Sequence, residues 1–171
     1  GGRGGALAVG FEYSGGMHEP PVSPPAGASD RSAPSLQTLL SAVDSLGGMQ
    51  QTWLQRWVEV NSFSRNRAGC AQMGALLAEA FQLTGLEARE IAAADGALGS
   101  HWLFATKTFA RGDGIVLIGH HDTVFPAGTF EGFRTDGERA FGPGVLDMKG
   151  GLSVIWRVLA AAAATGTLAS W

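Results

Sequence analysis

The chain has 171 residues, which is long enough for one domain with a buried core. Hydrophobic residues make up 45% and charged residues 16%, a composition typical of a globular protein. The net charge of -3 and the absence of any Lys- or Arg-rich run argue against a nucleic-acid partner. The longest apolar segment, residues 152–164, contains Arg157 and is shorter than the roughly 20 residues of a membrane-spanning helix, so we expect no membrane partner.

Cys70 is the single cysteine, which excludes an internal disulfide and a Cys-x-x-Cys metal site. It falls on an apolar helical face, so we predict a thiol in the core and not a nucleophile. A lone thiol is compatible with a reducing compartment, and the N-terminal residues make a poor signal peptide. We therefore expect a cytoplasmic protein.

Residues 1–34 are rich in Gly and Pro and show no hydrophobic period, so we predict a disordered leader followed by one unit over residues 35–171. Apolar residues at helical spacing predict helices over residues 35–46, with Ser35 as the N-cap, and then over 49–60, 68–83 and 152–164. Short strands are predicted at residues 86–91, 101–109 and 115–118, and Asp136-Gly137 predicts a hairpin. A tight turn at 111–114 makes a second hairpin plausible, between 101–109 and 115–119. This order of elements indicates an α/β fold.

Polar side chains gather where two of these elements end. The apolar run 115–118 reads as a buried strand, and His120 follows it directly. Asp122 points to the same side of an extended chain as His120, so its carboxylate is within reach of the imidazole. Asp147 lies on a glycine-rich turn, residues 142–151, that opens the last helix. Imidazole nitrogen and carboxylate oxygen are ligands for Zn²⁺, and a carboxylate behind a histidine ligand orients its ring.

These residues also fit two other kinds of site, a histidine–carboxylate pair without a metal and a nucleotide-binding loop. A His-x-Asp pair alone is weak evidence for a metal, because a buried neutral histidine with a carboxylate partner has the same pattern. The glycines around Gly142 also resemble nucleotide-binding loops. However, Asp147 stands where the dinucleotide fingerprint requires glycine, and Gly150 stands where a P-loop requires Ser or Thr after Gly-Lys. Each nucleotide-binding motif therefore lacks a residue that it requires, so neither interpretation holds.

Together the two segments resemble the M20 family of co-catalytic zinc metallopeptidases, which includes glutamate carboxypeptidase, acetylornithine deacetylase and succinyl-diaminopimelate desuccinylase relatives. The family's Gly-His-x-Asp-Thr-Val motif is met by residues 119–124, and its Gly-x-x-Asp-x-Lys-Gly-Gly motif by residues 144–151. The resemblance implies that His120 binds one zinc ion, that Asp147 bridges two, and that Asp122 orients the His120 ring as part of the catalytic apparatus. It also implies a cis peptide bond between Asp147 and Met148. His121 stands at a position that is usually apolar in the family, so we expect a packing or solvent-facing residue there.

The resemblance covers the N-terminal part of a three-layer α/β/α catalytic domain, truncated before the lid domain. The family's general base, its remaining metal ligands and the lid that supports a homodimer come later in its sequences. We therefore expect the chain to be an N-terminal fragment of a zinc hydrolase that cleaves an amide bond of an N-acyl amino acid or of a C-terminal peptide residue, inactive in isolation. The alternative is a non-catalytic fragment or binding module that retains the front half of the fold. Neither the acyl group nor the side chain of a small substrate is fixed by the sequence.

Overall fold

The computed structural model of the protein describes residues 33–107, 109 and 114–170. These residues belong to one compact unit that begins at Ala33. Almost all of the predicted leader, residues 1–34, lies outside the described residues.

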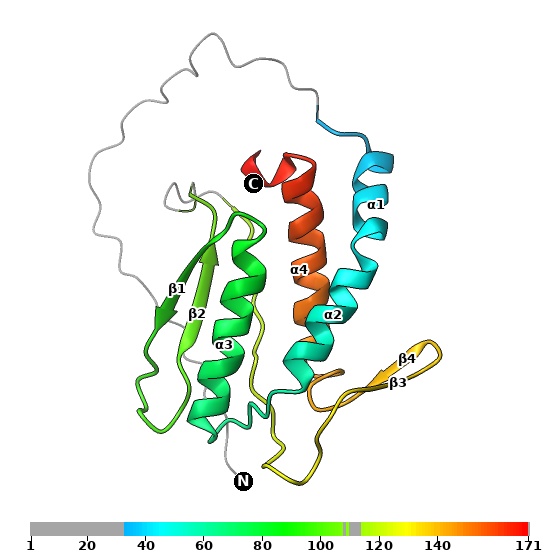
Figure 1. The fold of residues 1–171 in the computed structure, drawn as a ribbon. Coiled ribbons are helices and arrows are strands. Elements are labelled where there is room, and N and C mark those ends of the chain that lie inside the picture. Colours follow the sequence, from blue (N-terminus) through cyan, green and yellow to red (C-terminus); the bar gives the residue numbers. More distant parts are fainter. Residues whose placement is uncertain (1–32, 108, 110–113, 171) are drawn as a thin grey trace, which may run out of the picture. The chain divides into compact units, whose positions relative to one another are not determined.

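The predicted helices are present, with small shifts at their ends (Figure 1). They are α1 (Leu36–Ser45), α2 (Gly47–Val58), α3 (Arg67–Gln82) and α4 (Lys149–Ala164), followed by the short 3₁₀ helix η2 (Thr167–Ser170). Ser35 caps α1 as predicted, because its hydroxyl accepts a hydrogen bond from the Thr38 amide at 3.1 Å. No helix among the described residues is long and apolar enough to cross a membrane.

Tryptophan side chains from α2 and α4 form the centre of the core. The ring centroid of Trp53 lies 6.1 Å from that of Trp57 and 6.3 Å from that of Trp156. Trp156 is 1% exposed, and its indole N–H donates to the backbone oxygen of Ala80 in α3 at 2.9 Å. Burial of these large rings and satisfaction of the Trp156 donor hold α2, α3 and α4 together. Cys70 is buried, so the prediction of a core thiol is confirmed.

The strands form two separate antiparallel pairs. β1 (Glu87–Ile91) pairs with β2 (His101–Ala105), and β3 (Arg134–Asp136) pairs with β4 (Arg139–Phe141). The second pair is the hairpin predicted from Asp136-Gly137, and Gly137 has the positive φ of 58° that such a turn requires. The described residues therefore have a mixed α/β fold with two small sheets.

The prediction of a buried strand at residues 115–118 is wrong. Ile115, Val116, Leu117 and Ile118 are 68%, 71%, 52% and 86% exposed, and this segment pairs with no other described residue as a strand. A central strand is buried only where neighbouring strands and helices cover it, and here its apolar residues lack such neighbours. The expected hairpin with 101–109 is also not formed: β2 ends at Ala105 and pairs with β1, while residues 111–113 of the expected turn lie outside the described residues.

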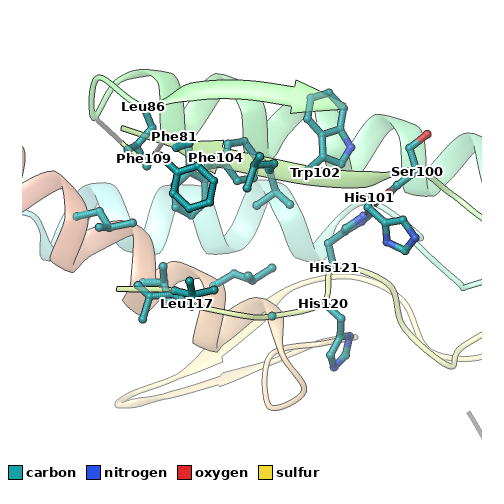
Figure 2. A pocket seen from close by; sticks show the side chains of 18 of the residues that line it. Phe81, Leu86, Ser100, His101, Trp102, Phe104, Phe109, Leu117, His120 and His121 are labelled. Carbon is teal, nitrogen blue, oxygen red and sulfur yellow. Dashed lines mark hydrogen bonds between the residues drawn. The ribbon is translucent and has the colours of Figure 1, made fainter. Parts of the chain in front are cut away.

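A cavity of about 480 Å³, here called the sheet cavity, separates β2 from residues 114–119 (Figure 2). Its walls are mostly apolar. Side chains from α3 and α4 contribute to them, including Leu77, Phe81, Leu152, Ile155 and Leu159. At one end the cavity reaches His120, His121 and Asp122. The candidate site therefore lies at the end of an apolar space between two extended segments.

Candidate functional site

His120 and Asp147 meet in the structure. The Nε2 atom of the His120 ring lies 2.9 Å from the Oδ1 atom of Asp147. The His120 side chain is 46% exposed and that of Asp147 is 82% exposed, so both are open to solvent. Two residues that the sequence analysis placed on different elements thus present an imidazole nitrogen and a carboxylate oxygen to the same point.

Asp122 lies on the other side of the His120 ring. Its Oδ1 atom is 3.2 Å from His120 Nδ1, and its backbone oxygen is 3.1 Å from the same nitrogen. A proton on Nδ1 is therefore held between two acceptors of one residue. This is the predicted arrangement of a carboxylate behind a histidine, and it leaves Nε2 directed toward Asp147.

The two carboxylates also change the protonation of His120. Partial burial lowers the pKa of His120, but the hydrogen bond to Asp147, the bond to the Asp122 backbone and the two negative charges outweigh it. The pKa of the ring is consequently raised above its ordinary value of 6.5. A metal ion that binds Nε2 must displace a proton from that nitrogen, so protons and metal compete at this atom.

A loop far upstream, residues 61–66, holds the backbone around Asp122. Ser62 donates its hydroxyl to the backbone oxygen of His121 at 2.7 Å, and the Thr123 amide donates to the backbone oxygen of Ser62 at 2.8 Å. The Ser64 amide donates to the backbone oxygen of Thr123 at 3.0 Å, and Phe63 forms a parallel bridge with Thr123. The two segments therefore run side by side as a short two-stranded clamp.

This role of residues 61–66 was not predicted from the sequence, which places them between the predicted helices over 49–60 and 68–83. The available signal was the density of short polar side chains, which commonly bond to nearby backbone. That signal predicts a structured turn. It does not identify a partner segment some 60 residues away, as here between Ser62 and His121.

Lys149 fixes the turn that contains Asp147 to the residues at the end of α2. The Lys149 side chain is fully buried, and its ammonium nitrogen lies 2.8 Å from the backbone oxygen of Trp57 and 2.9 Å from that of Val60. Trp57 lies in the last turn of α2 and Val60 just beyond it, and a positive charge is favourable at this end of a helix. The sequence identifies Lys149 only as part of the motif at residues 144–151, and its contacts with the Trp57 and Val60 oxygens were not predicted.

Glycines allow the same turn to close. Gly144 has a φ of 82°, and its backbone oxygen accepts from the Lys149 amide at 2.6 Å. A Cβ atom on Gly150 would lie 2.2 Å from the backbone oxygen of Val145, so only glycine fits there. The peptide bond between Asp147 and Met148 is cis, as the family resemblance implied.

His121 faces away from the pair formed by His120 and Asp147 (Figure 2). Its Nε2 atom lies 3.3 Å from the backbone oxygen of Ser100, and its buried Nδ1 atom has no partner among the described residues. Burial lowers the pKa of His121, which favours the neutral ring. His121 is thus a packing residue, which is one of the two alternatives expected for it from the sequence.

The donor set suits zinc in kind, since zinc binds imidazole nitrogen and carboxylate oxygen, and these two atoms of His120 and Asp147 lie 2.9 Å apart. Within residues 33–107, 109 and 114–170, no group of three or more His, Cys, Asp or Glu side chains could hold a metal ion. The described part of the chain thus offers two ligands, and a zinc site needs further donors. Comparison with protein-family models gives no match, and comparison with curated proteins gives no significant match.

Proposed function

We propose that the protein is the N-terminal part of a co-catalytic zinc hydrolase that cleaves an amide bond of an N-acyl amino acid or of a C-terminal peptide residue. The observation that carries the proposal is the 2.9 Å approach of His120 Nε2 to Asp147 Oδ1, with the Asp122 carboxylate behind the ring. On this proposal the mixed α/β unit is the front half of a three-layer α/β/α domain, and the rest of that domain supplies the general base and the remaining ligands.

Two residues of this chain would bind the metal, and a third would orient one of these ligands. Bound zinc would supply Lewis acidity that lowers the pKa of a water molecule and polarises the substrate carbonyl. His120 would offer Nε2 once the proton shared with Asp147 is lost. Asp122 would keep the other proton on Nδ1, so that the lone pair of Nε2 faces outward. Asp147, with two oxygens and an 82% exposed side chain, would be the second residue of this chain to hold metal.

Zinc binding by the metal-free protein tests this proposal directly. Isothermal titration with zinc, and the visible absorption of added cobalt(II), report whether the site takes a metal. We expect His120→Ala and Asp147→Ala each to weaken zinc binding by at least about tenfold, since even partners behind a ligand contribute on the order of 10–100-fold.

Matched controls separate this site from general surface binding. His101→Ala removes an exposed imidazole in β2, and Asp136→Ala removes an exposed carboxylate in β3. Both controls should bind zinc as the unaltered protein does. The proposal is wrong if all four variants bind zinc with the same affinity.

A second proposal, a non-catalytic binding module, is favoured by the donor number, because the described residues bring only two candidate ligands together. Both proposals predict no hydrolysis of acyl-glutamate substrates by the 171 residues with added zinc, and clear turnover would overturn that expectation. They differ in metal binding, because the module requires no zinc affinity that depends on His120 and Asp147.

A further inference from the structure

We propose that Ser64 is a positioning residue of this site: its hydroxyl fixes the Asp122 carboxylate, and through it the tautomer of His120 that presents Nε2 to a metal. The metal-binding part of this inference rests on the proposed function. The tautomer part concerns the metal-free protein alone.

The two oxygens of the Asp122 carboxylate have separate partners. Ser64 donates its hydroxyl to Oδ2 at 2.5 Å, while Oδ1 faces His120 Nδ1 at 3.2 Å. A hydrogen bond to an ionised acceptor is shorter and stronger than one between neutral groups, so the carboxylate competes well for the single hydroxyl proton. The backbone oxygen of Thr123 is the other acceptor within reach of this hydroxyl, at 3.2 Å.

The hydroxyl can set the rotation of the carboxylate because its own position is fixed. The Ser64 amide donates to the Thr123 oxygen at 3.0 Å, and the parallel bridge between Phe63 and Thr123 lies beside it. Ser64 is thus anchored by backbone bonds to the same segment that carries Asp122. The Asp122 side chain is 40% exposed, so without this anchor water would compete for the carboxylate and free its rotation.

His120 has two carboxylates competing for the proton of the neutral ring. A proton on Nδ1 bonds to Asp122, and a proton on Nε2 bonds to Asp147. Only the first tautomer leaves Nε2 free to bind a metal. Holding Oδ1 against Nδ1 therefore favours the metal-binding tautomer. The effect of losing Ser64 is partial, since the Asp122 backbone oxygen also faces Nδ1 at 3.1 Å.

Ser62 provides a matched control in the same loop. Its side chain is fully buried, and it donates to the backbone oxygen of His121, not to the Asp122 carboxylate. Ser62→Ala thus removes the same hydroxyl from the same clamp without touching the carboxylate. Ser64→Thr keeps a hydroxyl at the proposed position and serves as the conservative variant.

The test combines zinc affinity with ¹⁵N NMR of the His120 ring in the metal-free protein, at one pH where the ring is neutral. For Ser64→Ala we expect up to about tenfold weaker zinc binding, the lower end of effects seen for residues behind a ligand, and a larger Nε2–H fraction. Ser64→Thr should restore both quantities to within about twofold, and Ser62→Ala should change each of them less than Ser64→Ala does, even if it lowers stability.

The outcomes separate this inference from the proposed function. If the unaltered protein binds no zinc, the proposed function fails, and the tautomer comparison alone decides the role of Ser64. If Ser64→Ala leaves the tautomer ratio unchanged, or shifts it no more than Ser62→Ala does, Ser64 is only a structural part of the clamp and the inference is overturned.

Discussion

His120 Nε2 and Asp147 Oδ1 lie 2.9 Å apart, although 27 residues separate them in the chain. The ring thus sits between this carboxylate and that of Asp122, whose Oδ1 atom is 3.2 Å from Nδ1. An imidazole between two carboxylates is a good proton acceptor in the metal-free protein. On the proposed function, His120 can bind a metal ion only when the proton on Nε2 is lost.

Zinc affinity should therefore depend on pH in a range set by His120. The pKa of His120 is raised above its ordinary 6.5, so the ring remains protonated at pH values where a free histidine is mostly neutral. We expect the apparent zinc affinity to fall as pH decreases, with the fall beginning above pH 6.5. Titrations between about pH 6 and 8.5 measure this. An affinity that does not change across this range would show that His120 does not bind the ion.

Replacing Gly150 or Gly48 by Ala should change the unfolding free energy in opposite directions. Each is the second residue of its helix, Gly150 in α4 and Gly48 in α2. A Cβ atom at Gly48 would have nothing within 4 Å, so Gly48→Ala should raise the unfolding free energy by up to about 1 kcal/mol through helix propensity. A Cβ atom at Gly150 would lie 2.2 Å from the Val145 oxygen, so Gly150→Ala should lower it by about 1–3 kcal/mol.

The same pair of variants tests whether the Asp147 turn supports the site. Gly150→Ala forces the backbone around Val145 to move, and Asp147 lies in the segment between them. Zinc affinity should fall in Gly150→Ala and stay unchanged in Gly48→Ala. Urea unfolding and zinc titration give the two readouts, and equal behaviour of both variants would contradict the close packing seen at Gly150.

Lys149 should make the stability of the protein depend on pH in the alkaline range. Burial lowers the pKa of Lys149 from 10.5 to about 8, whereas the unfolded chain keeps the ordinary value. Between these two pH values the unfolded state binds more protons, so the unfolding free energy should rise as pH increases from about 8 to 10.5. The shift corresponds to roughly 3 kcal/mol, and this contribution is lost as pH falls from 10.5 to about 8.

The control for this prediction is the exposed Lys107, the other lysine of the chain. Lys107→Met should leave the pH dependence of the unfolding free energy unchanged, while Lys149→Met should remove the alkaline rise. Lys149→Met also removes the ammonium that donates to the Trp57 and Val60 oxygens, so its stability near pH 8 is expected to be low. The comparison therefore uses the slope against pH. A slope equal in both variants would show that Lys149 does not titrate as its burial implies.

The sequence predicts best what depends on neighbouring residues. Helical spacing of apolar residues located α1 to α4 to within a few residues, and Asp136-Gly137 located the β3–β4 hairpin, because both signals are local. The approach of His120 to Asp147 was expected from the motifs together with the element ends on which they lie. The partners of Ser64 and Lys149 were not, since each bonds to backbone more than 50 residues away, and no local pattern encodes which carbonyl a side chain will reach.

The prediction of a buried strand at residues 115–118 was wrong for a related reason. Four consecutive apolar residues describe what a buried strand is made of, but burial depends on neighbours that the segment itself does not specify. In the structure these side chains are mostly exposed, and the sheet cavity lies between them and β2. The apolar composition of the segment is plain in the sequence, while its environment was not predictable from it.

The same exposed segment should control self-association. An apolar extended segment with open edges pairs readily with another chain, and a lysine on such an edge opposes that pairing. Ile118 is 86% exposed and does not line the sheet cavity, so Ile118→Lys should reduce concentration-dependent aggregation without lowering the unfolding free energy. Leu36→Lys, at a 71% exposed position on α1, is the control for a general gain of charge. Light scattering over a concentration series measures both variants. If Leu36→Lys suppresses aggregation as strongly as Ile118→Lys, net charge and not the open segment is responsible.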